Sequence, residues 1–174
     1  MPDTVCNGCT DGFAERKRYT VAKRILFAAS SGGHLEQLMN LMPLTKKYAG
    51  AILTEKTAYS SPRTDLPLYL VRQVNRHEWK FLPLMVLNTF SSLKILRKER
   101  PDVIICTGAL ATVPVCLLGK KLFHAKLIFI ESFAKVNSPT VTGKLMYRFA
   151  DRFYVQWESM LEVYPDAIFL GGIY

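Results

Sequence analysis

Short apolar runs alternate with segments of helical spacing from residue 24 to the end of the chain. The runs with strand character are RILFAAS (24–30), AGAILTE (49–55), LPLYLV (66–71), DVIICTG (102–108), AKLIFIES (125–132), DRFYVQW (151–157) and AIFLGG (167–172). Helical spacing follows four of them, near residues 33–42, 79–100, 112–123 and 142–150. Continuous apolar runs are typical of strands buried on both faces. The alternation therefore predicts an α/β fold, a Rossmann-like parallel sheet with helices on both faces.

The length of 174 residues suits one domain with a substantial core. Residues 1–22 form a polar, basic segment, which we expect to be a disordered leader, and residues 23–174 form the folded domain. The net charge of +9 indicates an anionic partner: nucleic acid, nucleotide phosphates or an acidic membrane surface. Because the sequence shows no RNA-binding aromatic signature and no helix-turn-helix, nucleic acid ranks last and is not expected as a partner.

Two features raise the question of metal binding and membrane insertion. Cys6 and Cys9 form a CNGC motif, but a structural zinc site needs four ligands and no second pair follows, so no metal site is expected. Cys106 and Cys116 lie in apolar runs and are expected to be buried. A membrane span needs about 20 largely uninterrupted apolar residues, and charged or polar residues interrupt the most apolar stretches, 81–96 and 110–130.

Polar residues and glycines gather where the predicted strands end. Ligands of open α/β sheets bind outside the carboxyl ends of the strands, so the candidates are Ser30–His34, Glu55, Thr107–Ala109 and Glu131–Ser132. In SSGGH the glycines let the backbone approach a phosphate closely, and the helix that follows turns free N–H groups toward it. A tight strand-to-helix turn is the alternative explanation of the same two glycines.

His34 is the candidate catalytic residue of this edge. At a helix N-terminus the dipole disfavours the imidazolium, so we expect a lowered pKa and a neutral ring. A neutral imidazole beside a phosphate can accept the proton of an attacking hydroxyl. The alternative is a histidine that only hydrogen-bonds the turn. The sequence contains no GxGxxG fingerprint, no GxxxxGK[ST] loop and no GxSxG elbow, which argues against a dinucleotide site, a P-loop and a serine hydrolase.

Three segments together resemble a known family. SSGGHLEQL (30–38), TGALATVP (107–114) and IESFAKVNSPTVTGKLMYRFADRFYVQW (130–157) are similar to the membrane-associated subunit of a two-component glycosyltransferase. In eukaryotes that subunit helps to add the second N-acetylglucosamine to dolichol-diphosphate oligosaccharide, and bacterial relatives serve capsule and exopolysaccharide assembly. The similarity extends from Arg24 to the C-terminus.

The resemblance implies the N-terminal, acceptor-side half of a GT-B glycosyltransferase, with a small donor-binding subunit as partner. It implies no cofactor, because the UDP-sugar is a co-substrate held mainly by that partner, and it implies a polyprenyl-diphosphate-linked glycan as acceptor. His34 would be the base, and the last residues, LGGIY, would contact the partner. The residues that would bind the acceptor and its diphosphate are Ser31, Gly32, Gly33, Thr107, Gly108, Glu131 and Ser132. For Glu131 a structural acid that anchors the following loop is the alternative.

The segment HEWKFLPLMVLNTFSSLKILRKER (77–100) combines apolar residues at its start with basic residues at its end. It is typical of a helix that lies on a membrane of anionic lipids. We predict a peripheral protein on the cytoplasmic, inner face of the membrane. The alternative is a core helix with a solvated basic last turn; both hold if one side packs on the sheet. The residues predicted to face the membrane are Trp79, Phe81, Leu84, Met85, Lys94 and Arg97.

Two readings of function compete at this point. The first is the glycosyltransferase subunit, which we expect to be inactive without its partner because half of the cleft belongs to another chain. The second is a stand-alone nucleotide- or nucleotide-sugar-binding Rossmann domain without transferase activity. Tight binding of a UDP-sugar by the isolated chain would favour the second.

Overall fold

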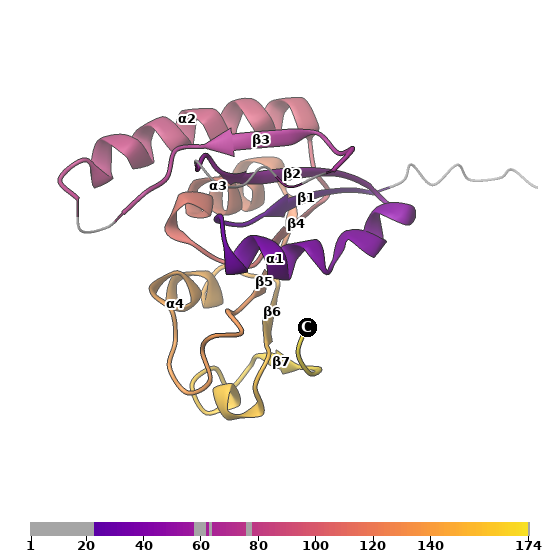
Figure 1. Cartoon of the computed structure of the whole chain (residues 1–174), viewed down its shortest axis with the longest axis vertical. Coiled ribbons are helices and arrows are strands. Elements are labelled where there is room, and N and C mark those ends of the chain that lie inside the picture. Colours follow the sequence, from indigo (N-terminus) through magenta and orange to yellow (C-terminus); the bar gives the residue numbers. More distant parts are fainter. Residues whose placement is uncertain (1–22, 58–61, 63, 76–77, 174) are drawn as a thin grey trace, which may run out of the picture.

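A seven-stranded parallel sheet forms the centre of the molecule (Figure 1). The computed structural model describes residues 23–57, 62, 64–75 and 78–173; the expected leader and its CNGC motif lie outside them. The strand order is β3-β2-β1-β4-β5-β6-β7. The strands are β1 (Arg24–Ala28), β2 (Ala49–Glu55), β3 (Leu68–Val71), β4 (Val103–Cys106), β5 (Lys126–Ile130), β6 (Arg152–Val155) and β7 (Ile168–Phe169). The predicted Rossmann-like parallel sheet is confirmed.

Helices cover both faces of this sheet, as Figure 1 shows. They are α1 (Gly33–Met39), α2 (Phe81–Glu99), α3 (Val113–Phe123) and α4 (Val141–Tyr147), with short 3-10 turns at Met42–Lys46, Leu110–Thr112 and Glu158–Leu161. Pro43 stands at the start of the first 3-10 turn, so α1 ends before it, as expected for a residue that cannot continue a helix.

The core has one layer on each face of the sheet. On β1, Leu26 and Ala28 belong to one layer, and Ile25 and Phe27 belong to the other. Because successive side chains of a strand point to opposite faces, a strand with both faces covered must be apolar at every position. This explains the continuous run RILFAAS. Cys106 and Cys116 are buried free thiols in the first layer, as expected.

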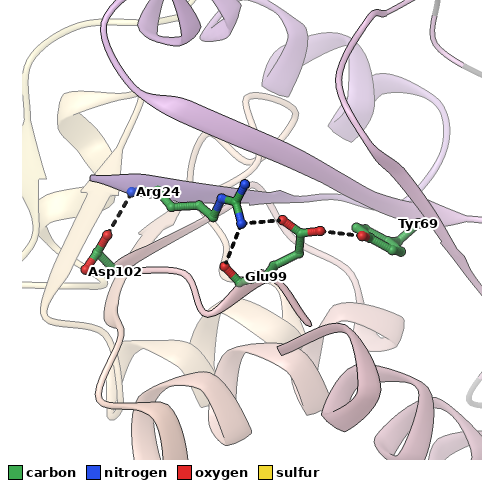
Figure 2. Close-up of polar contacts among 4 residues, drawn as sticks. All are labelled: Arg24, Tyr69, Glu99 and Asp102. Atoms are coloured by element: carbon green, nitrogen blue, oxygen red, sulfur yellow. Dashed lines mark hydrogen bonds and ion pairs between the residues drawn. The ribbon is translucent and has the colours of Figure 1, made fainter. Parts of the chain in front are cut away.

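Polar contacts fix α2 to the sheet at its middle and at its end. Asn88 is buried; its Nδ2 donates to the Arg72 carbonyl (2.8 Å), and its Oδ1 accepts from the Arg72 N–H (3.0 Å). At the end of α2, the Glu99 carboxylate accepts a hydrogen bond from the Tyr69 hydroxyl and pairs with Arg24 at 3.4 Å (Figure 2). The first and third strands therefore hold the C-terminal end of the helix.

The other face of α2 points to solvent and is apolar over its first half. Trp79 is 86% exposed, Leu82 71% and Phe90 61%. Of the residues predicted to face the membrane, Phe81, Leu84 and Met85 are half-buried, and Met85 packs against the core. The exposed residues of the outer face are Trp79, Leu82, Val86, Leu87 and Phe90, followed by Lys94 and Arg97. We call this set the outer face of α2.

Candidate functional site

The loops that follow the neighbouring strands β1 and β4 meet at His34. The Thr107 hydroxyl, which is buried, donates to the His34 carbonyl at 2.8 Å. Gly108 has a φ of 122°, and a Cβ on it would lie 2.9 Å from Cε1 of the His34 ring. The ring therefore packs on a surface that only glycine provides. Thr107 holds His34 in place and uses its hydroxyl proton to do so; its contact with an acceptor stays a prediction.

The His34 side chain is half-buried and carries an unsatisfied nitrogen. Within the described part of the chain, its buried Nδ1 atom has no hydrogen-bond partner. The imidazole is thus held by backbone contacts and packing, with Nδ1 on its buried side, against Gly108.

The two glycines of the first loop lie open to solvent. Gly32 has a φ of 78°, so the backbone itself demands glycine there, and its carbonyl accepts from the N–H groups of Leu35 and Glu36. Gly33 lacks a positive φ, and a Cβ on it would meet no described heavy atom within 4 Å. The fold therefore does not require glycine at position 33. A ligand that approaches the backbone closely would require it.

Glu55 braces the first loop from the end of β2. Its carboxylate is buried and accepts hydrogen bonds from the backbone N–H groups of Ser31 and Val74. Burial raises the pKa of Glu55, and these two hydrogen bonds partly offset that rise. The sequence placed Glu55 at the ligand-binding edge of the sheet, and its contacts join the loops after β1 and β3.

Glu131, at the end of β5, is buried and its carboxylate is saturated with donors. It accepts from the Ser132 N–H (2.9 Å), from the hydroxyl and N–H of Thr140, and from the Tyr164 hydroxyl (2.9 Å). A Cβ on Gly143 would lie 1.9 Å from Glu131 Oε2, so α4 approaches the carboxylate directly. The geometry favours the structural alternative that the sequence left open, an acid that anchors the loop 132–140, over contact with the acceptor.

Burial and the negative charge of Glu131 together raise the pKa of the Tyr164 hydroxyl far above its usual value. That hydroxyl therefore remains a donor to the carboxylate at any physiological pH. Ser132 is half-buried at the start of the same loop, and its carbonyl accepts from the Lys135 N–H at 3.0 Å.

A pocket that sequence reasoning missed opens at the same edge of the sheet. It has a volume of about 570 Å³ and lies between the segments that follow β3, β4 and β5. Its described lining consists of Gln73, Val74, Asn75, Ala109, Leu110, Lys135, Pro139, Thr140, Val141 and Thr142. Isolated loop residues follow no periodic pattern, so the sequence offered no signal for Lys135 or Gln73.

Neither a metal centre nor a membrane span is found in the described ranges. No three histidine, cysteine or acidic side chains come close enough there to hold a metal ion. None of the helices within residues 23–57, 62, 64–75 and 78–173 is long and apolar enough to cross a membrane.

The fold and the glycine-histidine edge define the class to which the chain belongs, a Rossmann-like half of the GT-B type. In the solved structure of MurG from Acinetobacter baumannii, 77% of this chain superimposes with a TM-score of 0.64 at 16% identity. UDP-GlcNAc 2-epimerase from Methanocaldococcus jannaschii superimposes over 86% of the chain, with a TM-score of 0.64 at 12% identity. The chain spans 41% and 45% of those two proteins, so it matches less than half of each.

The sequence relationship is more specific than the fold. The family described as "Oligosaccharide biosynthesis protein Alg14 like" matches residues 25–173, and the chain belongs to this family. A relative from Yarrowia lipolytica, named UDP-N-acetylglucosamine transferase subunit ALG14, is 27% identical over 92% of this chain and 85% of its own length. The predicted family, and with it the predicted class of glycosyltransferase subunit, is confirmed.

Proposed function

We propose that this chain is the acceptor-binding subunit of a two-chain glycosyltransferase that transfers N-acetylglucosamine from UDP-N-acetylglucosamine to a polyprenyl-diphosphate-linked acceptor. The donor is taken from the names of the relatives, which are UDP-N-acetylglucosamine transferase subunits. A diphosphate-linked acceptor agrees with the net charge of +9 and with open glycines at the carboxyl edge of the sheet.

The observation that carries this proposal is the junction of two loops at His34. Thr107 binds the His34 carbonyl and Gly108 supports its ring, while Gly33 leaves space for a ligand on the same loop. A half-buried imidazole that is fixed by its backbone is suited to accept a proton in a defined direction. The sugar diphosphate of the acceptor would extend along this edge of the sheet, with Gly32 and Gly33 against one part of it.

The proposed reaction is a single displacement. A hydroxyl of the acceptor sugar gives its proton to a His34 ring nitrogen while its oxygen forms a bond to the anomeric carbon of the donor. The bond from that carbon to the UDP oxygen breaks, and UDP leaves with the electron pair, which inverts the configuration at the carbon. A positioned general base contributes about 10²–10⁴ to the rate of such a step.

A second subunit would hold the donor. The relatives are named as subunits, and this chain matches less than half of MurG. The surface proposed for that partner lies beside the last described residues. Leu170 is 79% exposed next to an apolar groove of about 440 Å³ that is lined by Leu41, Leu44, Ile128 and Tyr154.

The outer face of α2 would place the subunit on the cytoplasmic face of an anionic membrane. Its large apolar side chains face solvent, and Lys94 and Arg97 continue the same face toward the end of the helix. A helix of this kind buries its apolar residues at the headgroup boundary while its basic residues meet anionic lipids. The acceptor, which is itself lipid-linked, would then meet the site at the membrane surface.

The test is sugar transfer into lipid-extractable product from labelled UDP-N-acetylglucosamine, with host membranes as the source of acceptor. The assay is run with this chain alone, with the candidate partner alone and with both together. Transfer only in the mixture is expected. Transfer by this chain alone would disprove the proposal that a second subunit holds the donor. Tight binding of UDP-N-acetylglucosamine by the isolated chain, with no transfer in the mixture, would favour the stand-alone nucleotide-sugar-binding domain.

A further inference from the structure

The pocket at the carboxyl edge has a single charged group among its described lining residues, the ammonium of Lys135. Lys135 is half-buried. Across the described ranges, its Nζ takes part in neither of the two ion pairs, which join Arg24 to Glu99 and Lys120 to Asp151. A lysine that is partly withdrawn from water without a counter-charge favours the binding of an anion.

The loop that carries Lys135 is anchored on both sides of it. The Trp157 indole N–H donates to the Phe133 carbonyl at 2.7 Å, and the Ser159 hydroxyl donates to the Val136 carbonyl at 2.5 Å. The Lys135 N–H itself donates to the Ser132 carbonyl. These bonds order the backbone before a ligand arrives, so binding does not have to supply the ordering entropy of the loop.

The rest of the pocket combines amide groups with apolar walls. Gln73 provides an amide, whereas the Asn75 amide donates to Glu78 Oε1 at 3.2 Å. The side chains of Val74, Leu110 and Val141 provide apolar surface. A free phosphate needs no apolar wall, whereas a sugar diphosphate carries hydroxyl groups, apolar sugar faces and a charged group. This composition therefore fits a sugar diphosphate better than inorganic phosphate.

The position of the pocket indicates that the ligand carries a hydrocarbon chain. Its rim at Gln73–Asn75 precedes Trp79, the first residue of the outer face of α2, by only a few residues. In Figure 1 the β3 arrow points to the left of the view. The beginning of α2 and helix α4, which begins at the pocket, both lie on that side of the sheet. A lipid-linked ligand could thus lie with its hydrocarbon along α2 and its diphosphate in the pocket.

We propose that Lys135 binds the diphosphate of the lipid-linked acceptor, in the pocket formed by the segments after β3, β4 and β5. This inference rests on the proposed function and extends it to a residue outside the glycine-histidine loop. A diphosphate is also present in the donor, so the experiment has to separate the two sources.

The first measurement is steady-state transfer by the reconstituted complex with Lys135→Met, Lys135→Arg and, as matched control, Lys144→Met. Lys144 lies exposed on α4, outside the pocket. The acceptor KM of Lys135→Met should rise about tenfold or more, because a charge-assisted phosphate contact is lost, while its donor KM stays unchanged. Lys135→Arg and Lys144→Met should stay within about threefold of the wild type. A rise confined to the donor KM, or no change in either KM, would overturn the assignment.

The second measurement is calorimetric binding of a short-chain polyprenyl-diphosphate N-acetylglucosamine to the full chain without its partner. Lys135→Met should weaken binding about tenfold and Lys144→Met should not, with thermal unfolding as the check that both variants fold. If acceptor binding depends on Lys135 but the wild-type complex transfers no sugar, the proposed function is contradicted and the assignment of the pocket to the diphosphate still holds. Normal transfer with equal binding by both variants would contradict the pocket and leave the function.

Discussion

Gly32 and Gly33 are adjacent in the first loop, but the structure requires glycine at only one of the two positions. The positive φ of Gly32 makes glycine necessary for the fold, whereas neither the backbone angle nor a described neighbour makes it necessary at Gly33. Gly108 belongs with Gly32, since its φ is positive and a Cβ would press on the His34 ring. The contrast separates a glycine that the backbone angle requires from one that it does not require.

We predict that Gly33→Ala retains the stability of the wild type, or gains about 0.4–1 kcal/mol, because alanine restricts the unfolded chain more than glycine does. Transfer by the complex should nevertheless fall at least tenfold, since the new methyl group occupies the space of the ligand. Urea unfolding and steady-state transfer measure the two effects. Gly108→Ala is the control and should lose about 1–3 kcal/mol of stability; full activity of Gly33→Ala would show that no ligand approaches that backbone.

Glu55 is expected to make the stability of the chain depend on pH. Its folded-state pKa is raised by burial, so between its ordinary pKa and the raised one the folded state binds more protons than the unfolded state. The contribution of Glu55 to stability is therefore greatest below its ordinary pKa of about 4.5 and is lost as the pH rises through the folded-state value.

The measurement is the free energy of unfolding of the wild type minus that of Glu55→Gln, from pH 4 to pH 7. We predict that this difference falls as the pH rises, because glutamine cannot ionise. A difference that grows with pH would mean that the ionised carboxylate is the favoured form, held by the Ser31 and Val74 N–H groups.

Residue roles were harder to predict from the sequence than residue positions. His34, Thr107, Gly108 and Glu131 all lie at the carboxyl edge, as the ends of apolar runs indicated. Position at a strand end does not say where a side chain turns, however. Glu131 turns into its own loop, and the Thr107 hydroxyl turns to the His34 carbonyl, because buried polar groups must find partners.

At the scale of the element, α2 shows why a helix with apolar residues on two faces is ambiguous in sequence. The inner face includes Asn88, Ser92 and Ile95, and the polar atoms of Asn88 are satisfied by backbone groups of Arg72. A buried asparagine with such partners cannot be recognised without the neighbouring strand. The sequence therefore predicts Phe81, Leu84 and Met85 on the membrane side. In the structure, the most exposed large apolar residues of this segment are Trp79, Leu82 and Phe90.

We predict that the chain sediments with vesicles that contain anionic lipid and that Leu82→Ser, Val86→Ser and Phe90→Ser together abolish this binding. The three side chains are exposed, so the variant should unfold at the same urea concentration as the wild type. Phe81→Ser, Leu84→Ser and Met85→Ser form the matched control, which should lose stability instead because these residues are half-buried. Undiminished vesicle binding by the first variant would show that the outer face of α2 does not bind the membrane.

At the scale of the whole molecule, the succession of strands and helices along the chain followed closely from the sequence. Strands buried on both faces leave an unmistakable apolar run, and each of the seven runs became a strand. Six of the seven strands are shorter than their runs, because residues such as Thr107 and Ser132 belong to the loops that shape the site. The pocket at Lys135 could not be predicted, since it is assembled from three loops that are distant in the chain.

The C-terminal segment is connected to the site through one side chain. The Ile173 N–H donates to Gln156 Oε1 (3.0 Å), and Gln156 Nε2 donates to the Glu131 carbonyl (2.8 Å). A partner bound beside residues 170–173 would therefore lie on a segment that is fixed relative to the end of β5. This arrangement would let the second subunit complete the cleft without disturbing it.

We predict that Leu170→Asp weakens association with the donor-binding subunit at least tenfold, since it places a charge beside the apolar groove. Leu122→Asp is the control, because Leu122 is also exposed but lies at the end of α3, away from the groove. Sedimentation of the mixed subunits measures the association. Equal association of both variants would place the interface elsewhere.

The most direct test of the account is single-turnover transfer by the reconstituted complex with His34→Ala. We predict a fall of about 10²–10⁴ in the rate of the chemical step, with association of the subunits and binding of the acceptor unchanged, because the ring packs on Gly108 without carrying the core. Turnover near that of the wild type would contradict the central claim that the junction of the two loops at His34 carries out proton transfer.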